Sequence, residues 1–210
     1  MLNKVWLKRI RNLAGFLGMI LPWISLIGAV IVSFATGVPA AFWSTFSISA
    51  TYYICPALTG ILTAASIVLM CYDGYDWRDN LITTISGVFG IMIVLFPCAC
   101  TVAGATVGFV QLPVAISSII HCVSAYAFFI LLSINSLFLF TLGEKEPTKQ
   151  KKIRNIIYRV CGIGILCALT LTILPVSFFA KTFIVEAIAL TFFGISWLVK
   201  GQALGILKDK

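Results

Sequence analysis

Six stretches of mostly apolar residues, each about 20 residues long, constrain this chain more than any other feature of its sequence. A helix rises about 1.5 Å per residue, so a stretch of this length crosses the roughly 30 Å hydrocarbon core of a bilayer. Backbone groups find no water there and must pair within each stretch, as in a helix. The sequence therefore predicts an all-α polytopic membrane protein, a single domain (1–210) built as a bundle of six transmembrane helices, with spans at 13–35, 51–71, 81–97, 113–142, 156–174 and 182–199.

The composition excludes a water-soluble domain. Apolar residues make up 60% of the chain, charged residues 10%, and the mean hydropathy is +1.07. A soluble domain carries about 25% charged residues, so lipid must surround most of these side chains. The net charge of +8 does not indicate a nucleic-acid partner, because the basic residues stand in short patches between apolar stretches.

The positions of the basic residues predict the orientation of the helices. All of the 15 Lys and Arg residues except Lys181 fall at the amino terminus, at the carboxyl terminus, or at the links that follow the second and fourth spans. These regions lie on one side of a membrane that the chain crosses six times. Cytoplasmic loops carry an excess of Lys and Arg, so both the N and C termini are predicted to be cytoplasmic.

Glu186 is the only acidic residue well inside a predicted span. A carboxylate near the bilayer centre costs about 2.5–3.5 kcal/mol on insertion scales, and it therefore calls for a structural or functional reason. One interpretation is a pair with Lys181 that reaches toward the outer membrane surface. The other is a buried carboxylate that takes part in function.

His121, the single histidine of the chain, lies in the fourth span on a stripe of polar side chains. Spacings of three and four residues place the stripe on one helix face, which consists of Ser117, His121, Ser124, Phe128, Leu131 and Asn135. In lipid, such a face is expected to turn toward the bundle interior or a water-filled cavity. Hydrogen bonds that merely hold the helices together are the alternative role.

Residues 46–53 carry no charge and lead into the second span from the predicted outer side. Their hydroxyl groups can cap helices, and tyrosine is an ordinary anchor at a membrane interface. The predicted topology also puts His121 and Glu186 in the outer half of the membrane. We therefore expect one polar pocket there, formed by Ser47, Ser49, Tyr52, His121 and Glu186.

Three aspartates occupy the short predicted inner loop between the second and third spans: Asp73, Asp76 and Asp79. Gly74 permits a tight turn, and Asp79 or Asn80 can cap the third helix. The spacing is not that of a calcium-binding loop. We expect a structured turn rather than a cation site.

No metal and no cofactor are predicted. The seven cysteines match no zinc spacing, and one histidine is too few for a histidine-rich site. Most of the cysteines lie within spans, where Cys behaves as a small apolar residue. Cys98 and Cys100 stand at the outer end of the third span, where a disulfide with Cys55 or Cys122 is the alternative in an oxidising compartment.

The chain resembles a family of bacterial multi-pass membrane proteins for which no activity is established. The resemblance covers nearly the whole chain after the first span, and it is carried by Ser47-Ile48-Ser49 with Tyr52-Tyr53, by Tyr72 with Gly74-Tyr75-Asp76 and Asp79, by Leu95-Phe96-Pro97, by His121 with Ala125 and Phe128-Phe129, by Arg154-Asn155 with Tyr158, and by Glu186 with residues 193–201. It implies a fold of about six helices. The chain is also distantly similar to the ceramidase and progestin-receptor-like group of membrane hydrolases. Their metal depends on several histidines, so that zinc chemistry is not expected here.

These features fit three functions. The favoured one is a small transporter, channel or lipid-handling protein of the inner (plasma) membrane, whose pathway is the polar pocket. The second is a membrane sensor or assembly partner, in which the basic inner loop 145–159 binds anionic lipid headgroups or a cytoplasmic protein. The charge of that loop is also explained by topology alone. The third is an intramembrane lipid hydrolase with His121 as the base and Ser47, Ser49 or Glu186 assisting.

Overall fold

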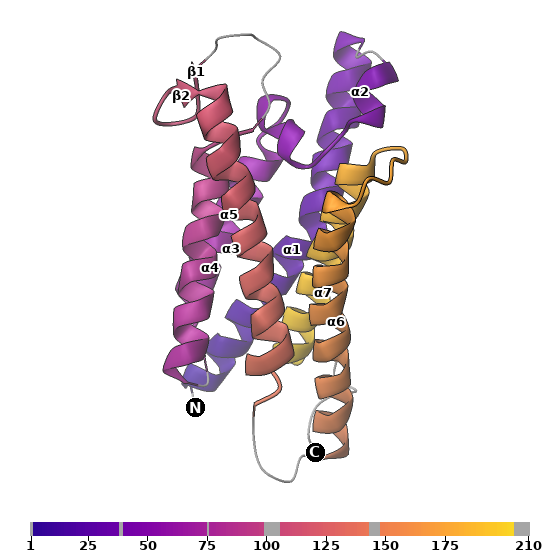
Figure 1. The fold of residues 1–210 in the computed structure, drawn as a ribbon. Coiled ribbons are helices and arrows are strands. Elements are labelled where there is room, and N and C mark those ends of the chain that lie inside the picture. Colours follow the sequence, from indigo (N-terminus) through magenta and orange to yellow (C-terminus); the bar gives the residue numbers. More distant parts are fainter. Residues whose placement is uncertain (1, 38–39, 75, 99–105, 143–147, 204–210) are drawn as a thin grey trace.

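The structure, a computed structural model, describes residues 2–37, 40–74, 76–98, 106–142 and 148–203. Its long helices form a bundle (Figure 1) and comprise α1 (Leu2–Thr36), α3 (Ala57–Met70), α4 (Trp77–Leu95), α5 (Val114–Ile134), α6 (Lys149–Ile173) and α7 (Lys181–Lys200). The short elements are the helix α2 (Ala40–Ser44), the 3-10 helix η1 (Ser49–Tyr53), the π-helix η2 (Asn135–Leu139) and the antiparallel strands β1 (Thr106–Val107) and β2 (Leu112–Pro113).

Five helices are long and apolar enough to cross a membrane: α1, α4, α5 continued by η2, α6 and α7. The chain is therefore a membrane protein with multiple spans, and the predicted all-helical class is confirmed. The start of α1 and the end of α7 lie at one end of the bundle, called here the terminal end (Figure 1). Helix α2 and the β-hairpin lie at the opposite end, called the hairpin end.

Helix α3 has only 14 residues and starts at Ala57, so the prediction of a helix from residue 51 is wrong at its start. Residues 49–53 form the 3-10 helix η1 instead, and Pro56 occupies the N-cap position of α3. Proline has no N–H group for a preceding helical turn and disfavours a helical conformation in the residue before it. One continuous helix over 51–71 is therefore interrupted at Pro56.

Residues 45–56, called here the entry segment, run into the bundle rather than over its surface. Phe46, Ile48 and Thr51 are buried. The amide of Phe183, in the first turn of α7, donates to the Phe46 carbonyl at 3.2 Å. Such first-turn amides have no partner within their own helix. Non-helical backbone at membrane depth is tolerated where protein surrounds it, and α7 supplies that surrounding here.

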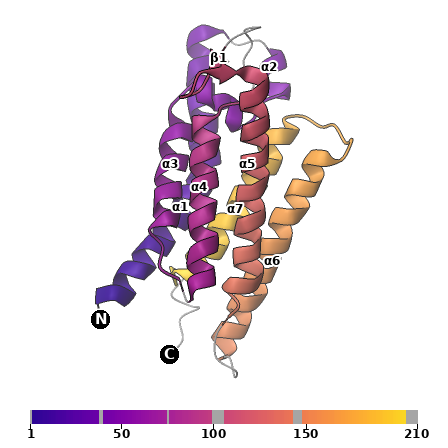
Figure 2. The ribbon, with the colours of Figure 1, turned by 60° about the vertical axis from the view of Figure 1, so that its left-hand side comes forward.

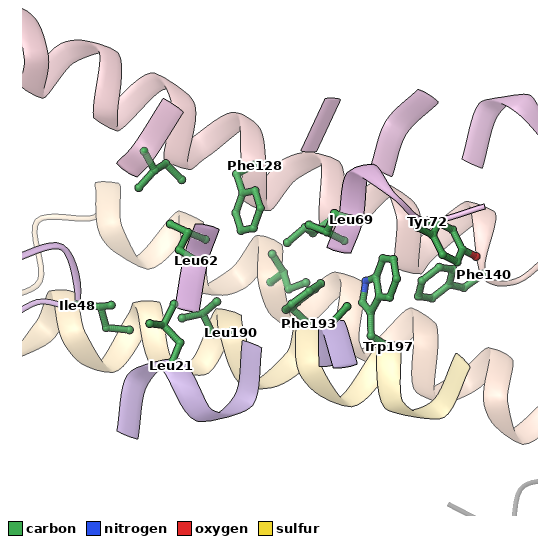
Figure 3. Close-up of a cluster of buried hydrophobic side chains, with 14 of the residues drawn as sticks. Leu21, Ile48, Leu62, Leu69, Tyr72, Phe128, Phe140, Leu190, Phe193 and Trp197 are labelled. Carbon is green, nitrogen blue, oxygen red and sulfur yellow. The ribbon is translucent and has the colours of Figure 1, made fainter. Parts of the chain in front are cut away.

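Large side chains fill the axis of the bundle (Figure 3). Fully buried Trp197 is met edge-on by Tyr72 and Phe140, with ring centroids 5.0 and 5.3 Å apart. The cluster continues toward the hairpin end through Phe193, Leu69, Phe128, Leu190, Leu62, Leu21 and Ile48. The entry segment is thus part of the same core as the long helices.

Helices α1 and α7 approach one another through facing glycines. A Cβ atom on Gly15 would lie 2.8 Å from the carbonyl oxygen of Gly194, and one on Gly194 would lie 2.7 Å from that of Gly15. Small residues let helix backbones come close in membranes, where dispersion forces hold helices together. This contact fixes α7, and with it Glu186, against α1.

Helices α5 and α6 lie closer together at the terminal end and diverge toward the hairpin end (Figure 2). In the closer part, the Ser133 hydroxyl donates to the Gly162 carbonyl at 2.9 Å. The polar stripe on α5 turns inward as predicted: Ser117, His121, Ser124, Phe128 and Asn135 are buried, and Leu131 is half-buried.

Candidate functional site

Glu186 on α7 holds the entry segment through its carboxylate. The backbone amide of Ile48 donates to Oε2 at 2.6 Å, and Oε1 lies 3.1 Å from the hydroxyl oxygen of Ser49. Lys181 is engaged elsewhere, because its ammonium group donates to the Leu174 carbonyl at 2.8 Å, just after the end of α6. Of the two interpretations of Glu186 from the sequence, these contacts favour the buried carboxylate.

His121 on α5 is 3% exposed and faces the end of α4. Its Nδ1 atom lies 2.9 Å from the Phe96 carbonyl oxygen and 3.2 Å from that of Ile93. One turn earlier, the Ser117 hydroxyl donates to the Pro97 carbonyl at 2.7 Å. The last carbonyl groups of a helix have no intrahelical partner, so the polar face of α5 caps α4.

Ser49 joins these two halves of the site. Its hydroxyl oxygen lies 3.1 Å from His121 Nε2 as well as 3.1 Å from Glu186 Oε1. A carboxylate, a hydroxyl and an imidazole from three separate elements therefore form one row. Of the five residues expected to form one pocket, Ser49, His121 and Glu186 lie within hydrogen-bond distance of one another in this row.

The row forms part of the wall of a pocket of about 210 Å³ between α5, α6, α7 and the entry segment. Its polar lining also includes Ser47, and its apolar lining includes Phe129 and Val185. The pocket reaches the surface at Cys122 and Thr182, which are both exposed. Its lining comes in part from the middle of α5 and the last turns of α6. The ribbon shows these two helices diverging toward the hairpin end (Figure 2).

A second cavity of about 40 Å³ lies on the core side of Ser49 and Glu186, which line both spaces. The rest of its wall is apolar and includes Leu58, Phe128 and Leu190. The polar row therefore stands between an apolar interior and the larger pocket.

The remaining predicted pocket residues behave differently from one another. Ser47 lines the pocket of about 210 Å³, and its hydroxyl accepts from the Ala50 amide in the first turn of η1 at 3.0 Å. Tyr52 lines neither of the two cavities. Its ring meets Tyr53 edge-on and packs against the core. We therefore assign Tyr52 to packing.

Two thiols also line the pocket, from Cys98 and Cys122. Both are free, as is Cys55, while Cys100 lies outside the described residues. Burial raises the pKa of Cys98 to about 11. Cys98 is therefore a neutral thiol at physiological pH.

Sequence reasoning missed the polar contact between α5 and α6 that closes one side of the pocket. The Tyr126 hydroxyl and the Thr172 hydroxyl are hydrogen-bonded across it. A helical spacing of four residues links Cys122 to Tyr126, beside the stripe of His121. The spacing of Cys122 and Tyr126 could therefore have indicated a second polar face of α5, toward α6.

The three aspartates that precede and begin α4, Asp73, Asp76 and Asp79, form a structured turn. Asp76 caps α4 by accepting from the amides of Arg78 and Asp79, each at 3.0 Å. Asp73 accepts from the Asn80 side chain at 3.0 Å. Asp79 is fully buried and accepts from the Tyr72 hydroxyl at 3.2 Å.

Within the described residues, no group of three or more His, Cys, Asp or Glu side chains is placed to hold a metal ion. Comparison with protein-family models, with curated proteins and with solved structures found no match to the chain. The chemistry of the site must therefore be read from its own contacts. They describe a row of polar groups that can bind the polar part of a ligand and can hold a proton.

Proposed function

We propose that the bundle crosses the plasma (inner) membrane six times, with its terminal end in the cytoplasm. The distribution of Lys and Arg supports this orientation. Helix α3 rises only about 21 Å at 1.5 Å per residue, and the entry segment continues its path toward the hairpin end. The entry segment and α3 together therefore make the one crossing that is not a single long helix, which is the second along the chain.

Within this topology, the protein acts as a small transporter or lipid-handling protein that binds an amphipathic molecule in the outer half of the membrane. The observation that carries the proposal is the pocket of about 210 Å³, whose wall combines apolar side chains with the row of Ser49, His121 and Glu186. Ionisable residues inside membrane spans commonly mark substrate and ion pathways. A ligand with a polar head and an apolar body matches both kinds of lining.

A lipid hydrolase is the second candidate, since Ser49 and His121 lie within hydrogen-bond distance as a nucleophile and its base do. Such an enzyme also needs free N–H donors for the oxyanion. The Ile48 amide, one residue before Ser49, is already occupied by Glu186. This occupation favours binding over hydrolysis. Covalent labelling of Ser49 by a fluorophosphonate probe, lost on His121→Ala, would reverse that preference.

The accessibility of Cys122 tests the pocket. In a protein that keeps Cys122 as its only cysteine, a charged, membrane-impermeant methanethiosulfonate reagent added outside intact cells is expected to modify the thiol. Thiols react as thiolates, which form where water reaches the sulfur. Cys122 lines the pocket and is exposed.

Two other single-cysteine proteins serve as matched controls. Cys167 lies on the exposed side of α6 outside the pocket lining, and it is expected to react only with a lipid-soluble maleimide. Cys161 is buried and is expected to react with neither reagent. If Cys122 behaved as Cys167 does, the water-accessible pocket would be refuted, and modification from the cytoplasmic side alone would refute the orientation.

The basic face of α6 provides a proposed contact with anionic lipid headgroups. Lys149, Lys152 and Arg159 are exposed on it at spacings of three and seven residues, whereas Lys145 lies outside the described residues. Each Lys or Arg side chain near an anionic membrane surface contributes about 1 kcal/mol to the attraction between protein and lipid. Replacing all three by glutamine is expected to lower the preference for phosphatidylglycerol over phosphatidylcholine by at least about tenfold, as measured by native mass spectrometry.

The control for this experiment exchanges each lysine for arginine and Arg159 for lysine, which retains the charges. An equal loss of lipid preference in this control would show that charge does not cause the effect. An unchanged preference in the glutamine variant would leave topology as the sole role of these residues.

A further inference from the structure

The hydrogen bonds of His121 determine which of its ring nitrogens carries a proton. Nδ1 faces the carbonyl oxygens of Phe96 and Ile93, at 2.9 and 3.2 Å. Carbonyl oxygens only accept hydrogen bonds, so Nδ1 must be the donor and carry a hydrogen. In the neutral ring, Nε2 is then an acceptor, and in the imidazolium it is a donor.

Ser49 stands between Nε2 and Glu186 and has a single hydroxyl proton to donate. If the ring is neutral, that proton goes to Nε2, and the contact with Oε1 needs a hydrogen from a protonated Glu186. If the ring is an imidazolium, Nε2 donates to Ser49, which donates to an ionised Glu186. With a neutral ring and an ionised carboxylate, one of the two 3.1 Å contacts has no hydrogen in it.

We infer that Glu186 and His121 share one transferable proton, which passes between them through the hydroxyl group of Ser49. In the transfer, the carboxylic O–H bond of Glu186 breaks and its proton joins the Ser49 oxygen. The original hydroxyl proton of Ser49 moves to Nε2 at the same time. The acid becomes a carboxylate and the imidazole becomes an imidazolium, so the serine is unchanged and atoms and charge balance.

The other ionisable side chains around Glu186 and His121 do not compete for this proton. Cys98 contacts Ser49 as a neutral thiol and supplies at most a weak donor. On α5, Tyr126 is hydrogen-bonded to Thr172, and Cys122 is a free thiol on the pocket wall. On α7, Lys181 is held by carbonyl oxygens at the end of α6. Tyr52 and Tyr53 of η1 pack against each other.

The inference deepens the proposed function and rests on it in one respect, because it names a proton as the ion coupled to ligand binding. Glu186 Oε2 accepts the Ile48 amide at 2.6 Å, so Oε1, on the side of Ser49, is the oxygen that exchanges the proton. Binding of a cationic head group in the pocket would favour the ionised Glu186 and move the proton to His121. A ligand that donates a hydrogen bond to His121 Nε2 would favour the opposite state.

The single histidine allows a direct test. Protein labelled with ¹⁵N-histidine gives one imidazole, whose tautomer and charge are read by solid-state NMR in lipid bilayers. Infrared spectroscopy detects the carbonyl stretch of a protonated Glu186, which is identified by its absence from Glu186→Gln. At neutral pH, we expect either a neutral ring protonated at Nδ1 with a protonated Glu186, or an imidazolium with an ionised Glu186.

Ser49→Ala should remove the link between His121 and Glu186. The pH at which each of these groups changes its protonation should then differ from that in the wild type by about one unit or more. Ser117→Ala is the matched control, since it removes a hydroxyl one turn away on the same face and leaves the row intact. A neutral ring protonated at Nε2, or a neutral ring beside an ionised Glu186 in the wild type, would overturn the inference. These spectra are independent of Cys122 labelling, so a dry pocket and an unshared proton are separate outcomes.

Discussion

Replacement of Glu186 by alanine is expected to lower the free energy of unfolding by about 2–4 kcal/mol. The carboxylate is the acceptor for the Ile48 amide and contacts Ser49, and its loss leaves a donor of the entry segment unpaired at membrane depth. Steric trapping in bicelles measures this change directly. Two backbone bonds also join this part of the chain to the start of α7, in which the carbonyls of Ser44 and Phe46 accept from the amides of Ala180 and Phe183.

Glu186→Gln is the matched control for this loss. Its side-chain oxygen still accepts from Ile48, so the stability should fall by about 1 kcal/mol or less. Its amide cannot exchange a proton, so a proton-coupled flux should be lost in a bundle that remains folded. Equal stability of the alanine variant and the wild type would show that Glu186 does not hold the entry segment.

Replacement of Asp79 by alanine is expected to destabilise the terminal end by about 3–5 kcal/mol, because it removes one partner from a buried group of charges. Asp79 is fully buried and accepts from Tyr72, whose ring lies 5.3 Å from the Arg11 guanidinium carbon. Burial raises the pKa of Tyr72 above its ordinary value, and Asp79 raises it further, so the phenol remains a donor. Lys200 lies within electrostatic reach of Asp79 and Arg11.

Asp79→Asn separates charge from hydrogen bonding at this position. It keeps an acceptor for Tyr72 and removes the negative charge among Arg11 and Lys200. A loss close to that of the alanine variant would assign the effect to charge, and a small loss would assign it to the hydrogen bond. Urea is unsuitable for a membrane protein of this kind, so thermal unfolding in detergent followed by tryptophan fluorescence is the measurement. No destabilisation in either variant would contradict the buried charge group.

The sequence was sufficient to single out Glu186 and His121, because ionisable groups in lipid are expensive and stand out from an apolar background. Shared depth then placed Ser49 near them. The contact between Ser49 and Glu186 joins residues 137 positions apart, and only the packing of α7 against the entry segment brings it within 3.1 Å. Periodicity along the chain carries no information about such a distance.

The entry segment shows why hydropathy alone misplaced the start of α3. Residues 51–56 directly precede the apolar stretch of α3 and were counted with it, yet they form η1 and a turn into Pro56. An apolar stretch indicates that residues are buried, and both a helix and a buried loop satisfy that. Tyr52 was expected in the pocket because the predicted topology put it at the same depth as His121 and Glu186. Depth does not give the direction of a side chain, which here depends on η1 in place of the expected helix.

The pairing of the entry segment with α7 also has a consequence for the way the chain is made. Ile48 leaves the ribosome 138 residues before its partner Glu186, which at about 5–20 residues per second is a delay of roughly 7–28 seconds. During that interval the amide groups that α7 will later satisfy must be covered by the insertion machinery or by interfacial water. Helix α7 therefore completes the pairing of the entry segment, and a chain that stops before α7 leaves the Ile48 amide without its acceptor.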